Sequence, residues 1–191
     1  LLGVATQAIK SAADFEQSFN ILQSVSGATS DQMARMQQQA LDLGAQTSFS
    51  AGEAAKGMLE LSKSGMKAED IMAAMPGVLD LAAAGGLGVG DAAEIASNAL
   101  NSFHLPANKA KDVANLFAAA ANASSIEVTD MAQSMSQASA VAASYGQSIE
   151  TAAIAIALLG NNGIKGSDAG TSLKTMLSRL AAPTEEAAGL L

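Results

Sequence analysis

Residues 128–145, VTDMAQSMSQASAVAASY, decide the fold class. Their apolar side chains recur at steps of three and four residues, at Val128, Met131, Met135, Ala138, Ala142 and Tyr145. This spacing places the six residues on one face of an α-helix. A stripe of this kind is typical of helices that pack against each other along their length.

The same rhythm recurs in three other stretches. It runs over Ala8, Ala12, Phe15, Phe19 and Leu22, over Met33, Met36, Ala40 and Leu43, and over Ala169, Leu173, Met176 and Leu180. No segment keeps the period-two alternation of a β-strand. We therefore predict an all-α fold of about nine helices, arranged as antiparallel hairpins stacked in a bundle or a short solenoid.

Breaks between the helices are expected where glycine, proline and capping residues gather. They fall at 26–29, 44–50, 65, 85–90, 104–106, 122–125, 146–148 and 160–165. Thr29 with Gln32, and Ser50 with Glu53, have the spacing of a capping box, in which two side chains satisfy the first free amides of a helix.

The acidic residues near the start of alternate predicted helices indicate a weak internal repeat. Glu53, Asp91, Asp130 and Asp168 are separated by 38, 39 and 38 residues, and each is followed by small or apolar residues. In each repeat a second helix then carries an apolar pair: Ile71 and Met75, Val113 and Phe117, or Ile154 and Leu158. We interpret this as three helical hairpins and the start of a fourth, which bury their apolar faces by stacking.

Composition narrows the classes of function. The chain is 49% hydrophobic but only 3% aromatic and has nine methionines, so its core is built from Ala, Leu, Ile, Val and Met. Ten basic against 18 acidic residues argue against binding to nucleic-acid phosphates or to an anionic membrane surface. Without cysteine there is no disulfide and no thiolate metal site.

No segment has the pattern of a signal peptide or a membrane span. The longest apolar stretch, 73–90, contains Pro76, Asp80 and several glycines. We expect residues 1–26 to form an N-terminal amphipathic helix that continues from a longer chain and runs into a coiled coil. Residues 27–183 are expected to form a helical core domain, and residues 184–191 the start of a further segment.

Motifs for chemistry are weak. The single histidine, His104, stands at a predicted turn and has no partner for a metal site or for catalysis. The glycines of 86–90 resemble a phosphate-binding loop, but a helix rather than a strand precedes them, so a hairpin turn is the preferred interpretation.

The carboxylates and serines also lack the arrangement of an active site. Within each of the adjacent pairs Glu69-Asp70 and Glu185-Glu186, the two side chains would point in different directions on a helix, so they cannot face each other across a cleft. Asp80 stands among apolar residues, and we expect its carboxylate to form a helix cap or an inter-helix hydrogen bond. Ser26, Ser64 and Ser144 precede predicted helix ends and have no paired base. We therefore predict no catalytic, cofactor-binding or metal-binding residue, no cofactor, and a protein that is not an enzyme.

An ordered series of motifs over residues 15–183 resembles the core region of phage tail tape measure proteins. The motifs are FEQS (15–18), VSGAT (25–29), LGAQTSFSA (43–51) with EAA (53–55), MPGVLDLAAA (75–84), NNGIKGSDAGT (161–171) and LSRLAAPT (177–184). The sequence departs from the expected pattern at 86–90, which is richer in glycine.

The resemblance implies a structural component of the virion tail, or of a prophage-encoded equivalent, that helps set tail length and assemble the tail. It implies contacts with tail tube and tail tip or baseplate proteins and with tail assembly chaperones, and self-association. The excess of acidic residues argues against direct binding to nucleic acid, and contact with the host membrane during infection stays open.

Two alternatives stay open. One is a helical adaptor or effector that carries this domain in a short gene. The other is a membrane-active helical protein that assists DNA passage into the host, suggested by the positive mean hydropathy of +0.24.

Overall fold

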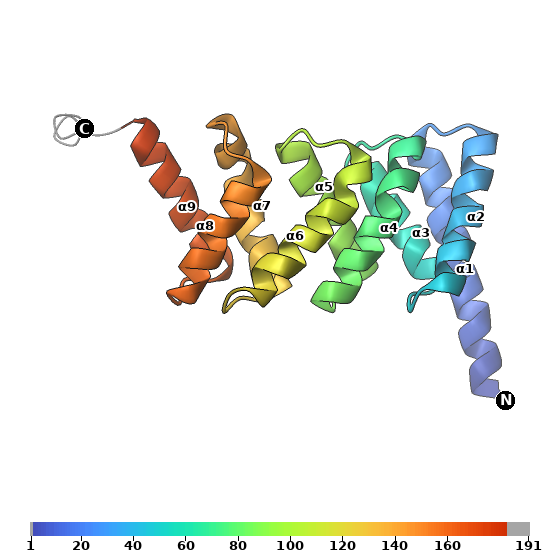
Figure 1. Ribbon diagram of the computed structural model, residues 1–191. Coiled ribbons are helices and arrows are strands. Elements are labelled where there is room, and N and C mark those ends of the chain that lie inside the picture. The colour runs from blue at the N-terminus through green and yellow to red at the C-terminus, as the bar shows by residue number, and fades with distance from the viewer. Residues whose placement is uncertain (1, 183–191) are drawn as a thin grey trace, which may run out of the picture. The chain divides into compact units, whose positions relative to one another are not determined.

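The computed structural model describes residues 2–182, with side chains from residue 12 onward. Within this part of the chain there are nine α-helices, one short 3-10 helix and no strand, so the all-α prediction is confirmed. The helices are α1 (Leu2–Ser26), α2 (Ser30–Gln46), α3 (Ala51–Lys63), α4 (Ala68–Gly85), α5 (Val89–Ser102), η1 (Ala107–Lys109), α6 (Ala110–Asn122), α7 (Val128–Ser144), α8 (Ile149–Asn161) and α9 (Gly166–Ala181) (Figure 1).

The helices form two compact units. The first contains the chain up to Ser97 together with Pro106–Ala114, and the second contains Asn98–Leu105 and the chain from Asn115 onward. Helices α5 and α6 therefore each contribute to both units.

In the first unit, α3 packs against α1, α2 and α4, and α4 also contacts α2 and η1. Methionine and leucine side chains of these helices are completely buried, among them Leu22, Met36, Met58 and Met75. Each such side chain contributes about 1.5–3 kcal/mol by leaving water. The core expected from composition is therefore present.

In the second unit, α7 packs against both α8 and α9, and α8 contacts α9. Four residues join α7 to α8 and four join α8 to α9, so successive helices turn back on each other as hairpins (Figure 1). The largest side chains that are at most 2% exposed here include Leu100, Phe117, Met131, Met135, Ile156 and Leu173.

Both predicted capping boxes are confirmed. The Thr29 hydroxyl accepts from the Gln32 amide and the Ser50 hydroxyl from the Glu53 amide, and each Gln32 or Glu53 side chain accepts from the amide of its capping residue. The four acids of the proposed repeat, Glu53, Asp91, Asp130 and Asp168, all lie in the first turn of their helices. There they oppose the positive end of the helix dipole.

Several helix boundaries differ from the expected breaks. Helix α2 continues to Gln46 rather than ending at Gly44, and Gly44 lies directly against Ala51 at the start of α3. The glycine-rich break is only three residues, since Gly85 ends α4 and Gly90 lies inside α5. The 3-10 helix after Pro106 was not predicted.

Some positions in the predicted apolar stripes are exposed. Tyr145 is 43% exposed because it caps α7 rather than continuing it, and Met176 and Leu180 of α9 are 48% and 64% exposed. In α8 the predicted pair Ile154 and Leu158 is exposed. The buried stripe of α8 instead runs through Ile149, Ala152, Ala153 and Ile156.

The predicted boundaries at residues 26 and 183 stay a prediction. Helix α1, the proposed N-terminal segment, ends at Ser26 and packs on α3. Residues 184–191, including Glu185 and Glu186, lie outside the described residues.

Candidate functional site

His104 lies at the end of α5, as the sequence predicts, and its backbone has the left-handed φ of 53°. Its counterparts at the ends of α3 and α7 are Gly65 and Gly146, with φ of 92° and 72°. After each of the three residues, the next amide donates back to a carbonyl of the last helical turn. His104 therefore terminates a helix, a role that glycine usually fills.

The glycine-rich segment also ends a helix. Gly86 has a φ of 60°, and its amide donates to the carbonyl of Ala82, the same carbonyl that accepts from Leu87 at 2.9 Å. A phosphate-binding loop would follow a strand and leave its amides free. The hairpin-turn interpretation of residues 86–90 is therefore supported by the geometry.

Two of the carboxylates that the sequence singled out, Glu69 and Asp80, form ion pairs between helices. Glu69 of α4 accepts two hydrogen bonds from the guanidinium of Arg35 on α2, at 2.8 and 2.9 Å. This hydrogen bonding lowers the pKa of Glu69 and raises that of Arg35. Asp80 lies 3.6 Å from the ammonium of Lys111, so it forms an exposed ion pair between α4 and α6 rather than the predicted cap or inter-helix hydrogen bond.

The serines at helix ends use their hydroxyls locally. Ser64 donates to Leu61 and Ser144 to Val141, at 2.7 and 2.8 Å, whereas the Ser26 hydroxyl accepts from the amide of Ala28. Among residues 12–182, no group of three acidic or histidine side chains is arranged to hold a metal ion.

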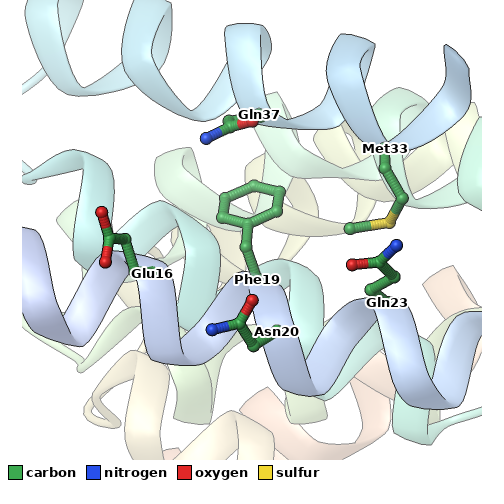
Figure 2. A pocket seen from close by; sticks show the side chains of 6 residues that line it. All are labelled: Glu16, Phe19, Asn20, Gln23, Met33 and Gln37. Atoms are coloured by element: carbon green, nitrogen blue, oxygen red, sulfur yellow. The ribbon is translucent and has the colours of Figure 1, made fainter. Parts of the chain in front are cut away.

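A polar pocket of about 210 Å³ lies between α1 and α2 (Figure 2). The ring of Phe19 points from α1 toward α2, Met33 and Gln37 line the pocket from α2, and Glu16, Asn20 and Gln23 line it from α1. Glu16 is the one carboxyl group of this lining. The other polar side chains of the lining, Asn20, Gln23 and Gln37, are amides that do not titrate.

No single helix within residues 2–182 is long and apolar enough to cross a membrane. Helices α4 and α5 meet the length and hydropathy requirement only when taken together as a bent pair.

The most specific geometry belongs to the motif NNGIKGSDAGT, which forms the end of α8 and the start of α9. A Cβ atom on Gly170 would lie 2.8 Å from Cβ of Gln137 and closer still to the carbonyl oxygen of Ser134. The buried Ser134 hydroxyl lies 2.6 Å from the carbonyl oxygen of Gly166, to which it donates. Helix α9 thus contacts the backbone of α7 directly.

The other half of the motif fixes the approach to α9. The amide oxygen of Asn161 accepts from the backbone amide of Ser125 at 2.9 Å, and Lys165 donates to the carbonyl of Ser125. Gly160 lies directly against the side chain of Ile126. The motif therefore holds the connection before α7 and the connection before α9 together.

A glycine in direct contact with the backbone of another helix also occurs in the first unit. Gly77 of the motif MPGVLDLAAA is buried directly against the backbone of Ala110 and Lys111. Sequence reasoning did not identify the role of Gly77, Gly170 or the Arg35–Glu69 pair. The spacing of an apolar stripe shows which face is buried but not where two backbones touch.

Comparison with known proteins gives a consistent result for this chain. A family model described as "Phage-related minor tail protein" matches residues 37–191. The chain is 45% identical over 185 residues to the tape measure protein of Pneumococcus phage Dp-1, covering 97% of the chain and 16% of that protein.

A second relative is the probable tape measure protein of Escherichia phage P2. It is 32% identical over 176 residues, which cover 91% of the chain and 22% of that protein. The chain thus spans less than a quarter of either relative. No solved structure matches the chain.

Proposed function

Because the chain belongs to the phage-related minor tail protein family and is similar to tape measure proteins over nearly its whole length, we propose that it is a structural segment that helps set tail length and assemble the tail. The observation that carries the proposal is the 45% identity to a tape measure protein over 97% of the chain. A place in the virion tail follows from the same proposal.

The geometry of the described residues fits a structural role. The motifs that carry the resemblance form helix caps and helix contacts: LGAQTSFSA with EAA caps α3, MPGVLDLAAA contacts the start of α6, and NNGIKGSDAGT fixes α9 on α7. These positions constrain packing rather than align a reacting group with a base. A role without catalysis is therefore favoured for this segment.

The partners proposed for the segment are the tail tube, the tail tip or baseplate, assembly chaperones and further copies of itself. The net charge of −8 is unfavourable for sequence-independent contact with DNA, which relies on clustered Lys and Arg. The segment is therefore expected to act on other proteins of the tail rather than on the genome.

Tail length measured by negative-stain microscopy tests the proposal. Deleting residues 51–159 in frame should shorten the tail by up to about 160 Å, from a helical rise of about 1.5 Å per residue. Duplicating the same residues should lengthen the tail, whereas a mere defect in tail assembly would not produce longer tails. Tails of unchanged length in both variants, or no tails from the deletion, would mean that the segment anchors or initiates assembly and does not count.

The alternative of a membrane-active segment has one observation in its favour, the bent pair α4 and α5. Against it, the apolar side chains Ile71, Met75 and Leu81 of α4 are already buried inside the first unit. Flotation with anionic and zwitterionic liposomes distinguishes the two functions. Co-flotation of the folded chain would favour the membrane-active function.

A further inference from the structure

The pocket between α1 and α2 combines one negative charge with several uncharged hydrogen-bond acceptors. The charge is the carboxylate of Glu16. Asn20, Gln23 and Gln37 can each turn an amide oxygen toward the pocket. Figure 2 shows these four side chains arranged around the ring of Phe19. A ligand group that is positively charged and donates several hydrogen bonds therefore matches this lining.

The carboxylate of Glu16 has no partner of opposite charge among the side chains that the structure describes. Asp14, two residues earlier in α1, lies 4.0 Å from the ammonium of Lys56. Residues 12–46 contain four acidic residues and one basic residue, Arg35, which already forms an ion pair with α4. The charges around the pocket therefore attract a cation.

The apolar part of the lining favours a guanidinium group over an ammonium group. Phe19 and Met33 line the pocket, and the ring of Phe19 is held by the ring of Phe15, with the two centroids 4.8 Å apart. An aromatic ring and a thioether offer a surface to a flat, weakly hydrated guanidinium, whereas a compact ammonium would lose its hydration there. The guanidinium also has several donors in one plane, for the Glu16 carboxylate and the amide oxygens.

The size of the pocket suits a single side chain. Its volume is about 210 Å³, whereas pockets for whole small-molecule ligands usually measure about 300–1,000 Å³. A second, more open hollow of about 430 Å³ lies along α1 and shares Glu16 and Asn20 with the pocket. The other residues of this hollow are Ala13, Gln17, Ile21 and Ser24. A protein segment that lies along α1 can therefore insert one side chain into the pocket.

We propose that this pocket binds an arginine side chain of another tail protein, presented by a segment that lies along α1. Glu16 is the counter-ion of the guanidinium, the amide oxygens accept its remaining N–H groups, and Phe19 and Met33 contact its flat face and its aliphatic stem. That the partner is a tail protein rests on the proposed function. The binding of arginine rests on the pocket alone.

A second copy of the chain is the main competing source of the arginine. Arg179 of α9 is exposed, so another copy can present it. Each copy carries a net charge of −8, however, so two copies repel each other, whereas a basic segment of a different protein is attracted. The different protein is therefore favoured.

Titration of the chain with a capped tripeptide, arginine between two alanines, tests the proposal by NMR of methyl-labelled methionines. The methyl signal of Met33 reports binding in the pocket, whereas the completely buried Met58 and Met131 are internal references. The control ligand carries citrulline, in which an uncharged urea group of the same shape replaces the guanidinium. The variant is Glu16→Gln, and its control is Glu94→Gln, an exposed glutamate of α5 that does not line the pocket.

We expect the arginine peptide to shift the Met33 signal with a dissociation constant about tenfold lower than that of the citrulline peptide, the effect of one charge-assisted hydrogen bond. Glu16→Gln should abolish this difference, and Glu94→Gln should retain it. A Met33 signal that does not move at millimolar peptide, or moves equally with both peptides, would overturn the proposal. Neither result bears on tail length, which tests the proposed function separately.

A dilution series without peptide identifies the source of the arginine. An unchanged Met33 signal at all concentrations of the chain supports a partner other than the chain itself. If the signal moves as the wild-type chain is concentrated, and does not move in Arg179→Gln, a second copy occupies the pocket. That result would overturn the assignment to another tail protein.

Discussion

The α2–α4 and α7–α9 interfaces join helices by opposite means. Between α2 and α4, long polar side chains reach across: Arg35 holds Glu69, and Gln39 donates to the carbonyl of Met72 at 2.9 Å. Between α7 and α9, the backbone of Gly170 touches that of Ser134, and the polar contact is one short serine hydroxyl. The first interface adjusts through flexible side chains, whereas the second depends on the absence of a single Cβ atom.

The largest effect is expected from Gly170→Ala. The new methyl group would meet the carbonyl of Ser134, and backbone cannot give way as a flexible side chain does, so we expect a loss of about 2–3 kcal/mol in the free energy of unfolding. Denaturant titration measures it.

The matched control is Gly90→Ala, also a glycine inside a helix, where the nearest atom to the new Cβ would be Glu60 Cγ at 3.7 Å. That variant should be neutral or stabilised by up to about 1 kcal/mol through helix propensity. Equal destabilisation of both variants would contradict the backbone contact at Gly170.

A smaller effect is expected from Ser134→Ala. It leaves the buried carbonyl of Gly166 without the hydroxyl donor, at a cost of about 1–2 kcal/mol in the free energy of unfolding. Ser136→Ala is the control, because its exposed hydroxyl bonds only to Gln133 within the same helix. If both substitutions have the same effect in a urea titration, the contact with Gly166 contributes nothing.

Glu53→Gln should weaken the start of α3 in a pH-dependent way. The amide and hydroxyl of Ser50 donate to the Glu53 carboxylate and lower its pKa in the folded state. The stabilisation is therefore present above the unfolded pKa of about 4.3 and is lost as pH falls through the lower folded pKa. Melting curves at pH 7 and pH 3 should show a difference between wild type and variant that is smaller at the lower pH.

The smallest effect is expected at the Arg35–Glu69 pair, whose side chains are 52% and 56% exposed. Exposed pairs are screened by water and salt. A double-mutant cycle with Arg35→Ala and Glu69→Ala should give a coupling smaller than the effect of Ser134→Ala, and none in 1 M salt. A coupling that persists in high salt would mean that the pair is more important to the α2–α4 interface than its exposure indicates.

Local features of the fold could be predicted because they depend on neighbouring residues. The capping boxes at Thr29 and Ser50 and the turn at His104 follow from a few positions in the sequence. At the start of α7, the backbone amide of Glu127 donates to the Asp130 carboxylate at 3.1 Å. This cap was not predicted, because the capping-box pattern requires Ser or Thr at the position of Glu127.

Long-range features could not be predicted. Arg35 and Glu69 are 34 residues apart, and nothing in the sequence pairs them. Periodicity predicted a buried Met176 but cannot tell whether a partner helix covers that position. The sequence marks Gly170 only as part of the motif NNGIKGSDAGT, although the contact that it permits fixes the position of α9.

The central claim is that repeating hairpins of 38 or 39 residues build this chain, and deletions of two lengths test it most directly. Removing residues 91–129, one repeat, joins Gly90 to Asp130 and keeps the register of the first helices. Removing only residues 91–109 joins the start of α5, the first helix of its hairpin, directly to α6, the second helix. We predict that the larger deletion retains helix content and a cooperative melting transition by circular dichroism, whereas the smaller deletion loses cooperativity. A smaller deletion that is as stable as the larger one would contradict the repeat.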